Sequence, residues 1–204
     1  MIAALAIVLA YVVGSFPSAY LAGRILKGVD LRTVGSGNLG ATNVYREVGL
    51  GPAIVVLALD AFKGWLAVVL LPRIFALPAT EWFPLVLGAA AIFGHTKPIF
   101  LLMRGGGKGV AAGGGVFLAI VPSAVLGGLI AFAIVVAATR YVSAASIAAA
   151  LTVPIVIALQ RGVSSPTFIA SLAIGAYVVW KHRTNLRRIA RGEERKIGRP
   201  GSAH

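Results

Sequence analysis

Apolar runs fill most of this 204-residue chain, and most of them are long enough to cross a lipid bilayer as helices. A bilayer core about 30 Å thick is crossed by about 20 helical residues. The chain is 58% hydrophobic and carries only nineteen basic and six acidic side chains, which excludes a water-soluble domain. We therefore predict an all-α polytopic membrane protein with apolar runs at 2–23, 52–71, 82–103, 110–138, 142–159 and 164–180.

The first and fourth runs need separate interpretation. The run 2–23 lacks a basic segment before it and a clear cleavage site after it, so we expect one retained helix rather than a signal peptide. The run 110–138 would form a helix of about 43 Å, too long for a single modestly tilted span. Pro122 interrupts it, so we expect two helices divided there.

The distribution of basic residues supports this division. The loop 24–50 holds four cations, and eight of the nineteen Lys and Arg residues lie between Lys181 and Arg199. The positive-inside rule places both segments in the cytoplasm, and only an even number of crossings between them satisfies it. We therefore predict seven transmembrane helices with the N-terminus outside and the C-terminus cytoplasmic. One short helix starts at the glycine-rich segment 104–115.

Three polar islands interrupt the apolar sequence. They are VGSGNLGATNVYREVG (34–49), RGGGKGVAAGGG (104–115) and KHRTNLRRIARGEE (181–194). Each combines glycines or side-chain amides with fixed cations, and such groups bind phosphate. The predicted topology puts all three in one compartment, so we expect them to form a single site for a phosphorylated molecule. We predict one domain over 1–192 and a basic cytoplasmic tail over 193–204.

The second island is predicted to be a phosphate-binding glycine loop. Its glycines allow backbone amides to converge on an anion, while Lys108 adds a mobile positive charge. It is not a P-loop. The eight-residue spacing that ends in Lys followed by Ser or Thr is absent, since Gly109 and Val110 follow Lys108, and no strand precedes the segment. The alternative is that these glycines serve only helix packing.

The first and third islands supply candidate polar ligands. In the first, Ser36 and its neighbours offer hydrogen bonds, and Arg46 can bind phosphate with two donors; ordinary turn and cap roles are the alternative. In the third, His182 and Asn185 share a helical face, although an interfacial histidine beside two cations can simply face lipid headgroups.

A few charged or titratable residues lie inside the apolar runs. Asp60 and Lys63 lie three residues apart on one helical face, which favours a structural ion pair. His95 lies ahead of the glycine loop and either orients that loop or simply packs. The chain has no cysteine and three scattered histidines, so we expect no metal site and no cofactor. The clustering of cations in the tail argues against a nucleic-acid partner.

The strings GSGNLGATNVYR, GGKGVA, RYVSAAS and HRTNLRRIARGEE resemble the bacterial acyl-phosphate:glycerol-3-phosphate acyltransferases, and the likeness extends to about Gly192. The resemblance implies a seven-helix enzyme of the bacterial inner membrane with its active site facing the cytoplasm. It implies transfer of a fatty acyl group from a long-chain acyl phosphate to the 1-hydroxyl of glycerol 3-phosphate. The products would be lysophosphatidate and phosphate, made in phospholipid biosynthesis. We expect a monomer whose other partners are membrane lipids.

The resemblance also implies roles for individual residues. It implies that Glu193 supports structural integrity and that Ser143 or Ser146 lines the site. Two positions depart from the family pattern: Gly105 replaces a frequent Lys or Arg, and Ala112 replaces Thr. We predict catalytic roles for Ser36, Arg46, Lys108, His182 and Asn185, and substrate or phosphate binding by Asn38, Thr42, Asn43, Gly105, Gly106, Gly107, Gly109 and Ser143.

The expected chemistry is direct acyl transfer without a covalent enzyme intermediate, because an acyl phosphate is already activated. Either His182 or a substrate phosphate oxygen would take the proton. There is no His-x-x-x-x-Asp motif, which argues against the thioester-using glycerol-phosphate acyltransferases. Two other classes remain at this stage: a small membrane transporter for an anionic solute, which should place such residues near the bilayer midplane, and a non-catalytic membrane scaffold.

Overall fold

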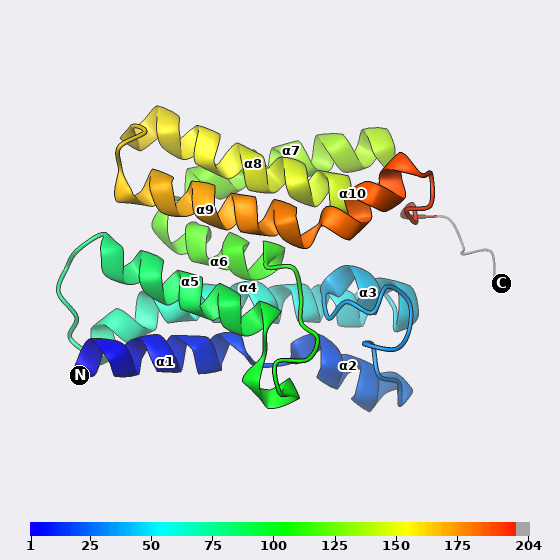
Figure 1. Cartoon of the computed structure of the whole chain (residues 1–204), viewed down its shortest axis with the longest axis horizontal. Coiled ribbons are helices and arrows are strands. Elements are labelled where there is room, and N and C mark those ends of the chain that lie inside the picture. Colours follow the sequence, from blue (N-terminus) through cyan, green and yellow to red (C-terminus); the bar gives the residue numbers. More distant parts are fainter. Residues whose placement is uncertain (199–204) are drawn as a thin grey trace. The chain divides into compact units, whose positions relative to one another are not determined.

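The computed structural model describes residues 1–198, and within them the secondary structure is entirely helical (Figure 1). Pro and Gly residues mark most of the helix ends. The elements are α1 (Ile2–Gly14), α2 (Ser18–Lys27), α3 (Ala41–Glu47), α4 (Leu50–Ile74), α5 (Trp82–Thr96), the 3-10 helix η1 (Ile99–Leu101), α6 (Val110–Ile120), α7 (Pro122–Thr139), α8 (Val142–Arg161), α9 (Pro166–Lys181) and α10 (Arg183–Ala190).

Within residues 1–198, five helical stretches are long and apolar enough to span a bilayer, and α6 and α9 are shorter apolar helices. Large apolar side chains stay exposed on them, among them Leu5, Ile54 and Leu129, as expected for surfaces that face lipid. The prediction of an all-helical membrane protein is confirmed. The five stretches are Ile2–Lys27, Leu50–Ile74, Trp82–Leu101, Pro122–Thr139 and Val142–Arg161.

The fourth apolar run divides at Pro122, as predicted. α6 ends at Ile120, and α7 begins with Pro122 in its first turn, where a missing N–H group costs no helical hydrogen bond. α6 has 11 residues, or about 16 Å at about 1.5 Å per residue. It is therefore long enough to cross only about half of a bilayer core, and it begins directly after the glycine loop.

Two helix boundaries differ from the prediction. The run 2–23 is not one helix: α1 ends at Gly14, and α2 starts after Pro17, which cannot continue the helical hydrogen-bond ladder. The run 82–103 stops being an α-helix at Thr96, because Pro98 disfavours helical backbone in the residue before it. The chain then turns through η1, and these turns bring Ser18 and the glycine loop into the site described below.

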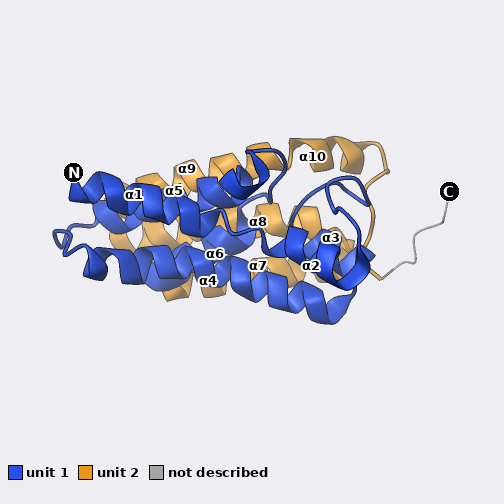
Figure 2. Cartoon of the chain, turned by 90° about the horizontal axis from the view of Figure 1, so that it is seen from below, with its two compact units in different colours: residues 1–120 blue, residues 121–204 orange. Residues whose placement is uncertain are grey.

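The chain divides into two compact units, Met1–Ile120 and Val121–His204 (Figure 2). In the first unit, α1, α4, α5 and α6 pack closely where small residues meet. A side chain at Gly14 would collide with the backbone of Ala91, and one at Gly64 with the backbone of Ala112. The buried core of α1, α4 and α5 consists of Ala6, Ala10, Ala67, Leu71, Leu87 and Ala91.

The second unit contains α7 to α10. α7 and α8 meet at a tight turn in which Arg140 has a left-handed backbone, φ 61°. After α10 the chain returns to this turn, because the N–H of Ile197 donates to the carbonyl of Arg140 at 2.9 Å. Lys196 lies 5.2 Å from the centre of the Tyr141 ring. The described part of the predicted tail is therefore folded against its own unit.

Candidate active site

A short ion-paired turn precedes the first island. The guanidinium of Arg32 donates to Asp30 at 2.7 and 3.0 Å, and Arg24 donates to the same carboxylate at 3.3 Å. The hydrogen bonds from Arg32 lower the pKa of Asp30 to about 2. Both arginines also lie over the ring of Tyr20, Arg24 at 5.5 Å and Arg32 at 5.1 Å from its centre. The chain therefore enters the first island from a fixed direction.

Asn43 organises the loop of the first island from inside. Its side chain is only 1% exposed. Its Oδ1 accepts the backbone N–H of Ser36 at 2.9 Å, and its Nδ2 donates to the carbonyls of Leu31 and Val34 at 3.1 and 3.2 Å. The geometry therefore supports a role in shaping the loop, while Ser36 itself stays partly exposed.

The other predicted ligands of the first island lie on or beside α3. Arg46 is in its last turn, and Thr42 is near its start; both are partly exposed, as is Asn38 in the loop before it. A side chain at Gly35 would collide with Asn43, so this glycine permits the close packing of the loop. Polar groups of the loop therefore remain accessible above a buried support.

The first and second islands meet within the first unit. The backbone N–H of Leu39 donates to the carbonyl of Gly106 at 3.2 Å. Gly105, Gly106 and Gly109 have positive φ values of 86°, 143° and 88°, a region that glycine adopts without strain. Lys108 precedes the first turn of α6, so it lies beside a helix N-terminus whose free N–H groups favour an anion.

The two family departures have different surroundings. The aliphatic part of Arg32 lies where a side chain at Gly105 would extend. Ala112 is fully buried on α6, and its backbone packs against Gly64 of α4. Position 105 is therefore at an exposed edge of the glycine loop, whereas position 112 belongs to a helix contact.

The third island lies in the second unit, where His182 is 3% exposed. Its Nδ1 is 2.8 Å from the carbonyl oxygen of Val178. A carbonyl can only accept, so Nδ1 carries a proton, and in the neutral ring Nε2 is the acceptor. The histidine ring is thereby fixed at the end of the last apolar helix.

A carboxylate that no sequence pattern indicated links this island to α8. Glu194 Oε1 accepts the hydroxyl of Ser143 and the amide of Asn185, each at 2.7 Å. Glu194 is buried, whereas Glu193 is exposed. The contacts to Ser143 and Asn185 are thus made by Glu194, and the structural role implied for Glu193 stays a prediction. The left-handed Gly192 turns the chain after α10 and was the available sequence signal for this return.

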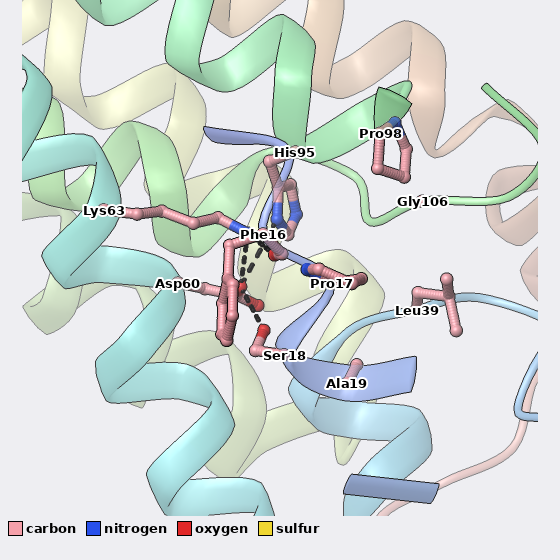
Figure 3. A pocket seen from close by; sticks show the side chains of 10 residues that line it. All are labelled: Phe16, Pro17, Ser18, Ala19, Leu39, Asp60, Lys63, His95, Pro98 and Gly106. Atoms are coloured by element: carbon pink, nitrogen blue, oxygen red, sulfur yellow. Dashed lines mark hydrogen bonds and ion pairs between the residues drawn. The ribbon is translucent and has the colours of Figure 1, made fainter. Parts of the chain in front are cut away.

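The predicted pair of Asp60 and Lys63 is confirmed, with Nζ 2.8 Å from Oδ1. Ser18, which no sequence pattern indicated, donates to the same oxygen at 2.6 Å. The pair lines a small pocket with Leu39 and Gly106 of the two loops (Figure 3). This ion pair therefore lies beside the junction of the two islands.

The family model described as "Glycerol-3-phosphate acyltransferase" matches residues 4–192. This chain belongs to the glycerol-3-phosphate acyltransferase family. The prediction of its family from the motifs is therefore confirmed, and the protein is an acyltransferase rather than a transporter or scaffold.

Curated relatives of the family match over more than nine-tenths of their length. The chain is 46% identical to the glycerol-3-phosphate acyltransferase of Synechococcus elongatus over 195 residues, which cover 93% of this chain and 92% of the relative. It is 42% identical to the glycerol-3-phosphate acyltransferase of Prochlorococcus marinus (strain NATL1A), and the match covers 93% of this chain and 96% of the relative.

A solved structure also matches along the whole chain. It is the crystal structure of PlsY, an integral membrane glycerol 3-phosphate acyltransferase, in its glycerol 3-phosphate form. Its TM-score is 0.85 at 33% identity, and 96% of each chain is covered. The likeness in both sequence and fold supports the membrane assignment.

Proposed function

We propose that this acyltransferase transfers a fatty acyl group from an acyl phosphate to the 1-hydroxyl of glycerol 3-phosphate, giving lysophosphatidate and inorganic phosphate. The acylation of glycerol 3-phosphate in phospholipid synthesis follows from family membership. The observation that most directly supports the location of the site is the hydrogen bond between the N–H of Leu39 and the carbonyl of Gly106. It joins two loops of phosphate-binding chemistry next to Lys108 and the start of α6.

The site must hold two anionic phosphates against their mutual repulsion. We assign the phosphate of glycerol 3-phosphate to Lys108 and to amides of the glycine loop, among them that of Gly109, while the N–H of Gly107 donates to the carbonyl of His95. Arg46 has two parallel donors suited to the phosphate of the acyl donor. Further polar contacts to the substrates are assigned to Asn38, Thr42, Ser143 and the loop that Asn43 supports.

The reaction then needs orientation more than activation. The carbonyl carbon of the acyl phosphate is attacked by the 1-hydroxyl, the carbon–oxygen bond to phosphate breaks, and phosphate leaves with the electron pair. Holding hydroxyl and carbonyl in contact removes most of the entropic barrier. Hydrogen bonds from Ser36 and Asn185 would stabilise the charge that develops on the carbonyl oxygen. No covalent enzyme intermediate is required.

The hydroxyl proton has two possible acceptors: Nε2 of His182 or a phosphate oxygen of the substrate. The Nδ1 bond to Val178 supports His182, since it leaves Nε2 with a lone pair. A pH-rate profile of His182→Ala separates the two. If His182 is the base, turnover falls at least about 100-fold; turnover close to that of the unaltered enzyme assigns the proton to the substrate.

We also propose seven membrane spans, with the N-terminus outside and the loops of the site in the cytoplasm of a bacterial inner membrane. Five long stretches together with α6 and α9 support this count, and so do the cations of 24–50 and of the tail. The chain has no cysteine, so single cysteines can be labelled from either side. Labelling of Thr33→Cys from outside intact cells would contradict the orientation.

The remaining assignments are part of the same proposal. The acyltransferase domain extends over 1–192 and is followed by the basic tail 193–204, whose Glu194 packs back onto Ser143 and Asn185. The enzyme acts as a monomer surrounded by membrane lipids, and it uses neither cofactor nor nucleic acid.

Purified enzyme in detergent provides the direct test. With palmitoyl phosphate and labelled glycerol 3-phosphate it should form lysophosphatidate, and Lys108→Ala should reduce the rate at least about 1,000-fold, because the charge next to the bound phosphate is lost. Lys27→Ala, which removes an exposed cation at the end of α2, is the matched control and should keep the rate within about twofold. Formation of lysophosphatidate from a palmitoyl thioester but not from palmitoyl phosphate would contradict the assignment of acyl phosphate as the donor.

A further inference from the structure

His95 contacts the glycine loop in two ways. Its backbone carbonyl accepts the N–H of Gly107 at 3.1 Å. Its ring fills the space beside the same residue, since a side chain at Gly107 would collide with the imidazole. Gly107 has no positive φ, so its backbone conformation does not require glycine. The histidine ring is what requires it.

The neighbouring glycine is enclosed from the same side. A side chain at Gly106 would collide with the carbonyls of Thr96 and His95. The carbonyl of Gly106 accepts the N–H of Leu39 from the first island. The C-terminal end of α5 therefore supports one face of the loop, and the first island supports another, directly before Lys108.

Asp60 holds the other side of the His95 ring. The Nδ1 of His95 is 3.5 Å from the carboxylate oxygen that also binds Lys63 and Ser18 (Figure 3). Lys63 donates in addition to the backbone carbonyl of Phe16, at 3.0 Å, and so fixes the break between α1 and α2. The side chains of Ser18, Asp60, Lys63 and His95 are buried, and the reaction described above uses none of them.

We propose that Asp60 and His95 are positioning residues for the glycine loop, which they hold in the conformation that presents Lys108 and the loop amides to phosphate. This inference rests on the proposed function, which assigns that loop to glycerol 3-phosphate. A loop of four glycines loses much conformational freedom when it is fixed, so it needs contacts from outside itself. The carboxylate orients the ring, and the ring restrains the loop.

A role in stability alone is the competing explanation. A buried ion pair between Asp60 and Lys63 would be sufficient for it, and the ring of His95 would then be an ordinary packing group. The two explanations differ in what happens to the loop. If His95 positions the loop, loss of its ring frees the glycine loop. If His95 only packs, loss of its ring lowers the overall stability without a specific change in the loop.

Because the chain lacks cysteine, one introduced thiol reports on the loop. The reporter is Lys108→Cys, and the measurement is its rate of alkylation in detergent. His95→Gln and Gly107→Ala, which disturb the same contact from opposite sides, should each raise this rate at least about fivefold by local opening. A second reporter, Thr184→Cys on the exposed side of α10, should react equally fast in every background.

Ser18→Ala is the matched control, because it removes a hydrogen bond from the same carboxylate without altering His95. It should leave the alkylation rate of Lys108→Cys within about twofold. Unchanged alkylation in both His95→Gln and Gly107→Ala overturns the proposal. So does an equal acceleration at Thr184→Cys, since that indicates general unfolding.

Kinetics in the enzyme that retains Lys108 give the functional readout. His95→Gln should raise the KM for glycerol 3-phosphate about tenfold, with a smaller fall in kcat. Faster alkylation with an unchanged KM would keep the positioning role but count against the glycine loop as the glycerol 3-phosphate site. A raised KM without faster alkylation would overturn the positioning role.

Discussion

The two units support their candidate site residues in different ways. In the first unit, the loops are held at several independent points: the ion pair of Asp30, the side chain of Asn43, the bond between Leu39 and Gly106, and the contacts of His95. In the second unit, Asn185 and Ser143 converge on the single carboxylate of Glu194. Support is distributed in one unit and concentrated in the other.

This difference should determine how each unit responds to substitution. Distributed support loses a part when one contact is removed, because the other contacts still restrain the loop. Concentrated support loses two hydrogen bonds to buried polar groups at once, and each such loss carries a desolvation cost. One substitution in the second unit should therefore cost more than one in the first.

Among the substitutions that test this comparison, Glu194→Ala should have the largest effect. It removes two hydrogen bonds to a buried carboxylate and should lower the free energy of unfolding by about 3 kcal/mol or more. The kcat/KM should fall at least about 100-fold as Asn185 loses its orientation. Thermal unfolding in detergent and lysophosphatidate formation measure the two effects. Glu193→Ala, which alters the exposed neighbour, should change stability by less than about 0.5 kcal/mol. Equal losses in both variants would remove the contrast.

Asn43→Ala tests the distributed support and should have an intermediate effect. The loop loses three hydrogen bonds but keeps its other contacts, so kcat/KM should fall about tenfold, mainly through a higher KM. Asn43→Asp keeps an acceptor for Ser36 and loses only the two donations. It should therefore fall between the unaltered enzyme and Asn43→Ala. Thr33→Ala, which removes only an exposed bond to the Asp30 carbonyl, is the control. A larger loss than in Glu194→Ala would reverse the comparison.

The smallest effect is expected for acid titration of Asp30. Its pKa of about 2 in the folded protein lies below the ordinary value of 3.8. The carboxylate therefore stabilises the fold at pH values above 3.8, and this stabilisation is lost as the pH falls towards 2. Asp30→Asn should lower stability at pH 7 by about 1 kcal/mol or less. The variant should then approach the unaltered protein as the pH drops. Parallel stability curves over that interval would contradict the ion-pair role.

Hydropathy was sufficient to predict the membrane helices, but chain length biased the interpretation of proline. The division at Pro122 was foreseen because an undivided helix would have exceeded the bilayer. The break at Pro17 was missed because the run 2–23 already had a suitable length. Both prolines act by the same physics, the absence of an N–H donor. An apolar run of the right length for one span can therefore still contain a break that shapes the site.

Site residues were predictable where their partners are close in sequence. Asp60 and Lys63 lie three apart on one helix, and their pairing followed from that spacing. Ser18 is 42 residues from Asp60, and Glu194 is 51 from Ser143, so only the folded chain brings these groups together. For Asn43 the sequence indicated a polar group suited to phosphate. It did not indicate that the side chain turns inward and binds its own loop.

The return of the chain after α10 also determines where this protein can be shortened. The family match ends at residue 192, two positions before the carboxylate that Ser143 and Asn185 share. A version trimmed to that limit would lose Glu194 and the Ile197 bond to the α7–α8 turn, although every family motif upstream of the cut would remain. Extensions for purification are better added beyond residue 198 than substituted for the last dozen residues.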